Sequence, residues 1–327
     1  MKKSGFTLLL CFIIGLSQTG EAWAREVVTG GRPVGISVSA DGVLVGGLSP
    51  VDTQGGSVSP AEKAGLCAGD LIIEANGKRL SDSQQLICAV RDSGGREMRL
   101  TAERGGEEKC FTVTPVQGAD GQWMLGLLLR DGISGIGTVT FYDRQTGIYG
   151  ALGHSISADS GGSTLKLDSG FISDAQIVSV EPAAPDAPGE LNGCADVSKV
   201  LGSIDANTAV GIFGISTEEL DGETVETGEM CVGEASILTT LDGSQPREYS
   251  ITVDRLYQQR EGTYALLTVT DSRLIRETGG IVQGMSGSPI LQNGRLVGAV
   301  THVFVSDSTK GYGVSIADML RASGIAA

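Results

Sequence analysis

A glycine-rich segment near the end of the chain, QGMSGSPI at residues 283–290, contains two serines that could act as nucleophiles. Ser286 has Gly284 two positions before it and Gly287 directly after it, so the backbone there can turn sharply and let a substrate carbonyl come close. Ser288 precedes a proline, which biases its backbone toward an extended conformation. We therefore predict that Ser286 is the nucleophile, with Ser288 as the alternative.

A serine hydroxyl needs a base to become nucleophilic, and that base is usually a histidine. The chain has two histidines, His154 and His302. His154 follows a glycine-rich turn at the end of an expected strand, in GIYGALGHSI, which favours it as the base. His302 lies inside the last strand-like segment, and we interpret it as a structural residue, with the lining of a substrate groove as the alternative.

Acyl transfer by a serine also needs amide donors for the oxyanion and an acid that orients the histidine. In a chymotrypsin-like arrangement the donors are the amides of the nucleophile and of the residue two positions before it, here Ser286 and Gly284. Two acids could orient the histidine: Asp271, which ends TYALLTVTD, and Asp143, in VTFYDRQTG. Both also fit ordinary turn-forming roles, so the residues alone leave both open.

The elements that must position these residues are strands. Strand-like segments separated by glycine-rich turns recur through residues 118–327, which is typical of a β-sandwich or barrel. The nucleophile segment leads into a hairpin through Asn293-Gly294, as in the double-barrel serine proteases. We therefore predict a mainly β chain whose second domain, residues 118–327, is a chymotrypsin-like double β-barrel.

The preceding region, residues 33–117, has a different pattern. In SPAEKAGLCAGDLIIEANGKRL, Pro60 suits the first turn of a short helix, and Asn76-Gly77 predicts a hairpin turn. Ser81 with Gln84 predicts a capped helix of about ten residues that ends near Gly94. These signals indicate a small α+β domain.

This order of signals resembles the PDZ family in its bacterial, protease-associated form. The resemblance implies that an extended peptide, such as a protein C-terminus, binds along a sheet edge beside the second helix. It also implies that Val34, Gly35 and Ile36 form the loop whose amides bind a terminal carboxylate.

Composition excludes several classes of function. The 327 residues carry a net charge of −15, which disfavours binding to nucleic acid. Two histidines and six cysteines in no C-x-x-C spacing predict neither a metal site nor a cofactor. The first 24 residues combine a basic start, an apolar stretch and the cleavage-like Ala22-Trp23-Ala24. They predict an export signal that is either removed or kept as a membrane anchor.

Three long segments, YGALGHSI, DSRLIRETGGIVQGMSGSPI and GAVTHVFVSDSTKGYGVSI, resemble the SpoIVB peptidase family. These are sporulation serine peptidases of the chymotrypsin-like clan with an N-terminal PDZ domain. The resemblance implies that His154 is the base, Ser286 the nucleophile and Asp271 the acid.

The same resemblance implies an exported endopeptidase of the forespore intermembrane space. Its expected substrate is the extracytoplasmic part of a membrane regulator that restrains an intramembrane protease in sigma-K activation, and it is expected to cleave itself. The alternative function is a non-catalytic exported scaffold, in which the first domain captures peptides and a degenerate protease domain binds partners.

Overall fold

The computed structural model describes residues 24–158, 164–184 and 187–325. Over these residues the chain is mostly β-strand, with four short helices, which confirms the mainly β prediction. The expected export signal, residues 1–24, lies outside the described residues except for its last position. Among the described helices, none has the length and apolar character needed to span a membrane.

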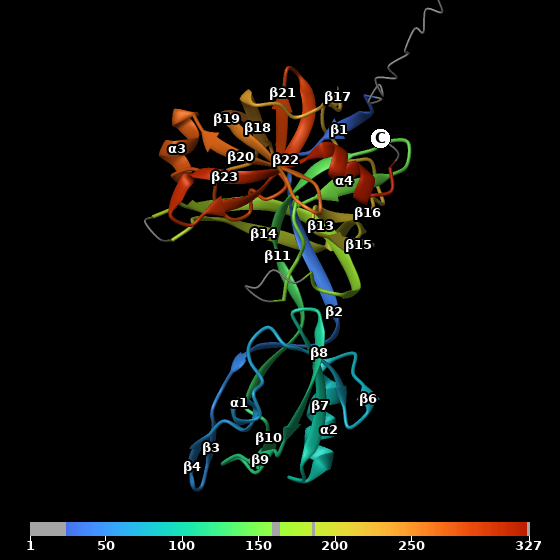
Figure 1. The fold of residues 1–327 in the computed structure, drawn as a ribbon, viewed down its shortest axis with the longest axis vertical. Helices are drawn as coiled ribbons and strands as arrows, with labels where there is room; N and C mark the ends of the chain where they lie inside the picture. The colour runs from blue at the N-terminus through green and yellow to red at the C-terminus, as the bar shows by residue number, and fades with distance from the viewer. Residues whose placement is uncertain (1–23, 159–163, 185–186, 326–327) are drawn as a thin grey trace, which may run out of the picture.

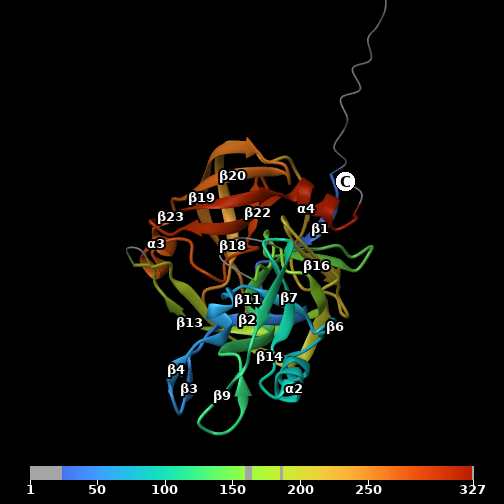
Figure 2. The same cartoon turned by 60° about the horizontal axis from the view of Figure 1, so that its bottom comes forward.

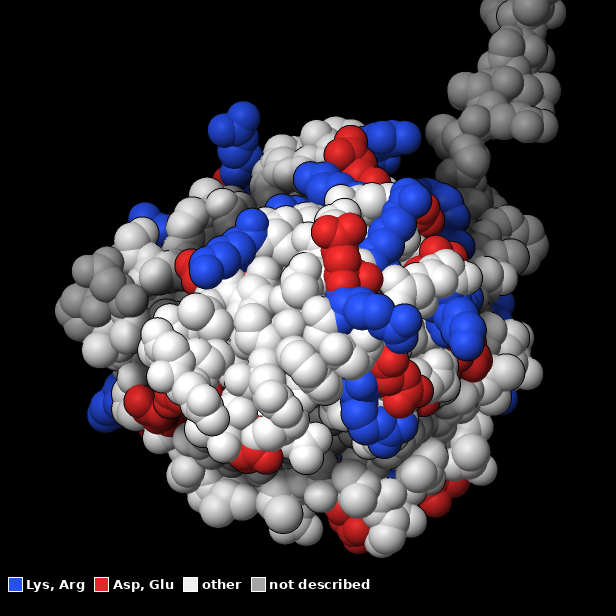
Figure 3. All heavy atoms as spheres, turned by 90° about the horizontal axis from the view of Figure 1, so that it is seen from below, with Lys and Arg blue, Asp and Glu red and all other residues white. Residues whose placement is uncertain are grey.

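The molecule has a small α+β domain at one end and a larger, mainly β domain at the other (Figure 1). Two long strands, β2 (Pro33–Leu48) and β11 (Leu127–Tyr142), pair antiparallel and run through both domains. Figure 2 shows the same arrangement with the small domain in front. Seen from the small-domain end, basic and acidic side chains are interspersed beside a broad area that carries neither (Figure 3).

The course of β2 and β11 corrects the expected domain boundaries of 33–117 and 118–327. The first half of β2 pairs with β11 and with β13 (Leu167–Glu181) in the large domain, where Val34 lies opposite Gly137 and Asp174. Its second half pairs with β5 (Leu71–Ala75) of the small domain. The small domain is therefore inserted between two strands of the large one. The sequence did not reveal this because pairing between distant strands is not a local pattern.

The small domain packs two helices against a sheet. Its further elements are β3 (Val51–Thr53), β4 (Gly56–Val58), α1 (Pro60–Lys63), β6 (Lys78–Arg79), α2 (Ser83–Ser93), β7 (Met98–Arg104), β8 (Glu107–Val113), β9 (Val116–Gln117) and β10 (Trp123–Met124). Pro60 opens α1 and the Asn76-Gly77 turn joins β5 to β6, as predicted. The cap of α2 is Asp82 rather than Ser81, because the Asp82 carboxylate accepts the Gln85 amide at 2.9 Å.

The large domain contains a closed six-stranded barrel and a half-barrel sheet. Its further elements are β1 (Glu26–Thr29), β12 (Ile148–Ala151), β14 (Glu190–Ser203), β15 (Ala206–Thr208), β16 (Gly211–Ile215), β17 (Thr224–Glu226), β18 (Gly233–Thr239), β19 (Arg247–Gln258), β20 (Thr263–Val269), α3 (Ser272–Thr278), β21 (Pro289–Gln292), β22 (Arg295–Phe304), β23 (Asp307–Ser315) and α4 (Ile316–Ala322). The barrel order is β18-β19-β20-β23-β22-β21. Of the two barrels expected, one is closed and the other is a half-barrel.

Two loops meet where the barrel faces the half-barrel. The histidine loop, residues 152–154, follows β12 of the half-barrel sheet. The nucleophile loop, residues 283–288, connects α3 to β21 of the closed barrel. Apolar side chains fill the barrel beneath the second loop, among them Leu274, Met285 and Ile290, all without solvent exposure. The fold thus brings together residues that are more than a hundred positions apart.

Candidate active site

The nucleophile loop is held by backbone hydrogen bonds at both ends. The Gln283 amide donates to the Gly189 carbonyl at 2.8 Å, and the Gln283 carbonyl accepts the Leu191 amide at 2.9 Å. At the far end, the Gly287 amide donates to the Val300 carbonyl of β22 at 2.8 Å. The loop is therefore anchored on a neighbouring loop and on a barrel strand.

Thr138 of β11 joins the two loops. Its carbonyl accepts the Leu152 amide of the histidine loop at 3.2 Å, and its amide donates to the Ser286 carbonyl at 3.1 Å. Its hydroxyl donates to the Gly284 carbonyl at 2.9 Å. Thr138 is buried, so each of these polar groups needs its partner. One side chain and its backbone thus fix the histidine loop relative to the nucleophile loop.

The close approach of the loops depends on Gly287. A Cβ at this position would lie 2.0 Å from the Thr138 carbonyl oxygen and 2.6 Å from the Leu152 amide nitrogen. Both neighbours are backbone atoms and cannot rotate away. Gly287 also has φ +96°, a conformation that side chains disfavour. Only glycine fits here without displacing one of the two loops.

The two serines of the nucleophile loop have different environments. Ser286 is half-buried and lines a pocket of about 570 Å³, and its hydroxyl donates to the Thr301 carbonyl at 2.6 Å. Ser288 is fully buried, and its hydroxyl has no partner among the described residues. Of the two, only Ser286 is placed where a substrate can reach it.

His154 lines the same pocket as Ser286. Its Nδ1 lies 2.8 Å from the Ser155 carbonyl oxygen. A carbonyl only accepts, so Nδ1 carries the proton and Nε2 is left unprotonated, which is the tautomer that a general base requires. Burial, together with the charge of His302, lowers the pKa of His154 to about 4. The imidazole is therefore neutral and ready to accept a proton at physiological pH.

His302 lies beside the predicted base. The ring centroids of His154 and His302 are 4.3 Å apart and the ring planes are tilted by 35°. His302 also lines the pocket that contains Ser286. The structural role that we favoured for His302 was incomplete, because the residue forms part of the groove wall.

The structure does not bring Asp271 to His154. Asp271 caps α3, where its carboxylate accepts the Arg273 amide at 2.8 Å and pairs with the Arg273 guanidinium at 2.7 Å. These hydrogen bonds to Arg273 hold the pKa of Asp271 well below its usual range. The carboxylate also accepts the Ser250 amide at 3.3 Å. The expectation that Asp271 orients the histidine is not supported by this arrangement.

Asp143, the other candidate acid, is also engaged elsewhere. It is fully buried at the turn between β11 and β12, where it accepts from Arg25 at 2.6 Å and from Thr146 at 2.5 Å. No Asp or Glu lies among the described residues that line the pocket. In this arrangement the group behind His154 is the Ser155 carbonyl, which sequence patterns could not distinguish from any other backbone oxygen.

The amides expected to form the oxyanion hole are those of Gly284 and Ser286. Gly284 has φ +94° and lines the pocket with Ser286. Within residues 24–158, 164–184 and 187–325, neither amide donates a hydrogen bond, whereas the amides of Met285, Gly287 and Ser288 all do. The two predicted donors are thus the ones left available for a substrate oxygen.

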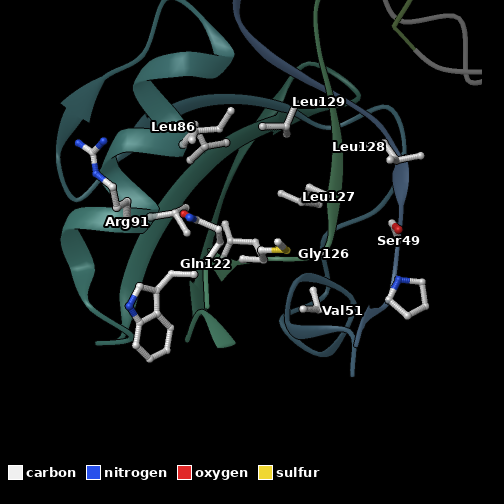
Figure 4. A pocket seen from close by; sticks show the side chains of 15 residues that line it. Ser49, Val51, Leu86, Arg91, Gln122, Gly126, Leu127, Leu128 and Leu129 are labelled. Carbon is white, nitrogen blue, oxygen red and sulfur yellow. The ribbon is translucent and has the colours of Figure 1, made fainter. Parts of the chain in front are cut away.

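A second groove lies in the small domain, between α2 and the start of β11 (Figure 4). Its volume is about 580 Å³. Apolar side chains from both elements line it, including Leu86, Ile87, Leu127, Leu128 and Leu129, with Arg91 at one end. Over Leu127–Arg130, β11 pairs with β2 on one side, and no described strand pairs with its other side.

Family models match both parts of the chain. The SpoIVB peptidase S55 model matches residues 121–320, and a PDZ domain model matches residues 51–104. The chain belongs to the SpoIVB peptidase S55 family. It is a PDZ-containing serine peptidase, as the sequence motifs implied.

Individual relatives match shorter stretches. The putative zinc metalloprotease LL2128 of Lactococcus lactis is 32% identical over 102 residues, which is 31% of this chain and 22% of the relative. The regulator of sigma-E protease RseP of Salmonella typhimurium is 37% identical over 68 residues, 21% of this chain and 15% of the relative. The chain thus spans about a fifth or less of these relatives' length. Among solved structures, the inactive form of Rv3671c protease aligns over 60% of this chain and 85% of its own, with 12% identity and a TM-score of 0.32.

The geometry of the S55 peptidase corrects one expectation about its PDZ domain. Val34, Gly35 and Ile36 do not form a carboxylate-binding loop, because they lie inside the large-domain sheet between β11 and β13. Their backbone groups therefore face neighbouring strands on both sides. The segment that borders the PDZ groove just before β11 is residues 122–126, which includes the short strand β10. Gly126 within MLGLLL, with φ +78°, is the signal that could have identified it.

The described part of the chain contains no group of three or more His, Cys, Asp or Glu side chains that could hold a metal ion.

Proposed function

We propose that this S55 peptidase cleaves peptide bonds with Ser286 as nucleophile and His154 as general base. The observation that carries the proposal is the shared pocket, which is lined by Ser286 and by a histidine in the tautomer that a general base requires. For attack, the Ser286 hydroxyl leaves the Thr301 carbonyl and turns toward Nε2 of His154. That nitrogen takes the proton as Oγ bonds to the scissile carbonyl carbon.

The later steps use the same groups. The amides of Gly284 and Ser286 donate to the oxyanion of the tetrahedral intermediate. Protonated His154 then gives its proton to the leaving amine, and a water molecule hydrolyses the acyl-enzyme by the reverse sequence. The Ser155 carbonyl keeps the imidazole oriented throughout by accepting from Nδ1.

The PDZ groove supplies the second binding surface in the proposal. An extended peptide adds as a strand to the free side of β11 and packs its side chains against α2. Arg91 of α2 is among the residues that line the groove, and its positive charge would attract a terminal carboxylate.

The biological setting is proposed from the family. The enzyme is exported and acts in the forespore intermembrane space, on the extracytoplasmic part of a membrane regulator in sigma-K activation. Self-cleavage is part of the same proposal. The match to the SpoIVB peptidase S55 model supports the sporulation part of this proposal.

A fluorophosphonate probe tests the nucleophile. Wild-type protein, Ser286→Ala and Ser288→Ala are incubated with the probe and compared for covalent labelling and for self-cleavage. We expect Ser286→Ala to lose both, and Ser288→Ala, if folded, to keep labelling. Labelling that survives Ser286→Ala would overturn the assignment. Equal processing by wild type and Ser286→Ala would favour the non-catalytic scaffold.

A peptide-binding assay tests the groove. Fluorescent peptides with free or amidated C-termini are titrated into wild type and Ile87→Glu, with Val178→Glu as the matched control. Ile87 and Val178 are 50% and 69% exposed, so both variants should fold, but only Ile87 lines the groove. Weaker binding by Ile87→Glu alone is the expected result.

A further inference from the structure

The pocket that contains Ser286 and His154 has aliphatic walls. The apolar side chains include Ile36 of β2, Ile136 of β11, Ile281 and Val282 before the nucleophile loop, Val303 of β22, and Val305 just after β22. The polar members are histidine, serine, threonine and glutamine. No Lys, Arg, Asp or Glu is among the described residues that line it.

This lining contrasts with the rest of the molecule, where 19% of residues are charged and the net charge is −15. A charged substrate side chain that entered the pocket would lose its water without meeting a partner of opposite charge, which is costly. An aliphatic side chain would instead exchange water for apolar contacts, which is favourable at about 25 cal/mol per Å² of buried surface.

The aliphatic walls lie close to the reacting atom along the chain. Ile281 and Val282 are buried and directly precede the nucleophile loop. Val303 lies two residues after Thr301, whose carbonyl accepts the Ser286 hydroxyl. All three residues line the pocket that contains Ser286, so a substrate side chain that enters this pocket beside the scissile bond would contact them rather than solvent.

We infer that this peptidase selects substrates with an aliphatic residue (Leu, Ile, Val or Met) beside the scissile bond and rejects a charged residue there. The inference rests on the proposed role of Ser286. It adds the class of cleavage site to the reaction, since the pocket that holds the nucleophile also determines which side chain binds next to it.

A peptide library tests the inference. Wild-type protein is incubated with a mixture of peptides in which all residue types are equally frequent, and cleavage sites are read by mass spectrometry. We expect aliphatic residues at one position flanking the cleaved bond to exceed charged residues at least about tenfold, the range that a single pocket contact provides. Equal cleavage beside charged and aliphatic residues would overturn the inference.

A substitution in the pocket wall tests whether the aliphatic lining causes the cleavage preference. Val303→Asp places a carboxylate in the pocket and should shift cleavage toward Lys or Arg at the same position by about tenfold or more. Val178→Asp is the control, because Val178 is exposed and does not line the pocket. If Val303→Asp fails to fold, Val305→Asp, at a pocket residue that is 57% exposed, replaces it. An unchanged preference in the folded wall variant would also overturn the inference.

Fluorophosphonate labelling distinguishes a failure of the specificity inference from a failure of the proposed function. A protein that is labelled at Ser286 but cleaves without aliphatic preference contradicts the specificity alone. A wild-type protein that is neither labelled nor cleaves any peptide contradicts the proposed function, and the inference with it.

Discussion

The amide of Thr138 donates a 3.1 Å hydrogen bond to the carbonyl of Ser286, across 148 positions of sequence between a half-barrel strand and the nucleophile loop. The Thr138 hydroxyl makes a second bond to the same loop, to the Gly284 carbonyl at 2.9 Å. A residue of the other sheet thus helps to fix the conformation of the nucleophile loop. The importance of the loop's position can therefore be tested by substituting Thr138, which is not one of the reacting groups.

Thr138→Val keeps the shape of the side chain and removes the hydroxyl. We expect a loss of about 1 kcal/mol in the free energy of unfolding, because the half-buried Gly284 carbonyl loses its hydrogen-bond partner. We also expect kcat to fall about tenfold or more, since small displacements of a nucleophile cost rate. Chemical denaturation and peptide hydrolysis measure the two effects. Thr138→Ser, which keeps the hydroxyl, should retain more of the activity, and equal losses in both variants would contradict the role of the hydrogen bond.

The fold was largely predictable because its signals are local. Alternating strands, the Asn76-Gly77 turn and Pro60 at the start of α1 each depend on neighbouring residues. The insertion of the small domain was not predictable, since it depends on which strand pairs with β2 in each half of its length. Pairing between distant strands leaves no period in the sequence.

The site was predictable where a residue type is itself the signal. Only two histidines were available, and glycines marked Ser286 as the accessible serine. The group behind His154 was not predictable, because the structure places a backbone carbonyl there rather than an acid. The loop 34–36 was misassigned for the opposite reason: its glycine suggested a binding loop, but its neighbours are paired strands.

The pH dependence of kcat/KM should report the pKa of His154. Only the neutral imidazole can take the proton of Ser286, so the rate rises with pH through this pKa and then levels off. Because burial and the charge of His302 disfavour the protonated ring, the midpoint should lie near pH 4, below the value of about 6.5 for a free histidine.

His302→Phe tests whether the charge of His302 lowers the pKa of His154. Phenylalanine keeps a ring beside His154 but carries no charge, so the pKa of His154 should rise and the midpoint should move to higher pH. The same rate profile in wild type and variant would show that His302 does not act on the base. A wild-type midpoint at or above 6.5 would indicate a carboxylate behind His154.

The Asp271→Asn variant tests whether the role of Asp271 is structural or catalytic. Asparagine can still cap α3 but loses the ion pair with Arg273, so we expect a loss of about 1 kcal/mol in stability. The carboxylate has a lowered pKa, so its contribution is present above about pH 4 and disappears as the pH falls further. The stability difference between wild type and variant should therefore shrink in acid.

The rate of Asp271→Asn decides the catalytic question. Replacing the positioning acid of a serine protease triad by its amide lowers kcat about 10⁴-fold. Because Asp271 contacts Arg273 rather than His154, we expect kcat of the folded variant to fall less than tenfold, and no further than in Asp143→Asn. A fall of several thousandfold in Asp271→Asn alone would restore the acid that the family resemblance implies.

Gly287→Ala tests the contact between the two loops. The added Cβ would lie 2.0 Å from the Thr138 carbonyl oxygen, so one loop must move. We expect a loss of more than about 2 kcal/mol in the free energy of unfolding, together with a large fall in kcat, because both strain and a displaced nucleophile result.

Gly294→Ala is the matched control for this substitution. Gly294 also has positive φ, at +74°, but a Cβ there meets no described atom within 4 Å. Its replacement therefore adds backbone strain alone, about 1 kcal/mol, and it lies in the hairpin turn after β21 rather than in the nucleophile loop. The folded Gly294→Ala protein should keep its kcat and its labelling at Ser286. If Gly287→Ala loses no more stability or activity than Gly294→Ala, the loops do not need the close approach at Gly287, and the case for its role in placing Ser286 beside His154 fails.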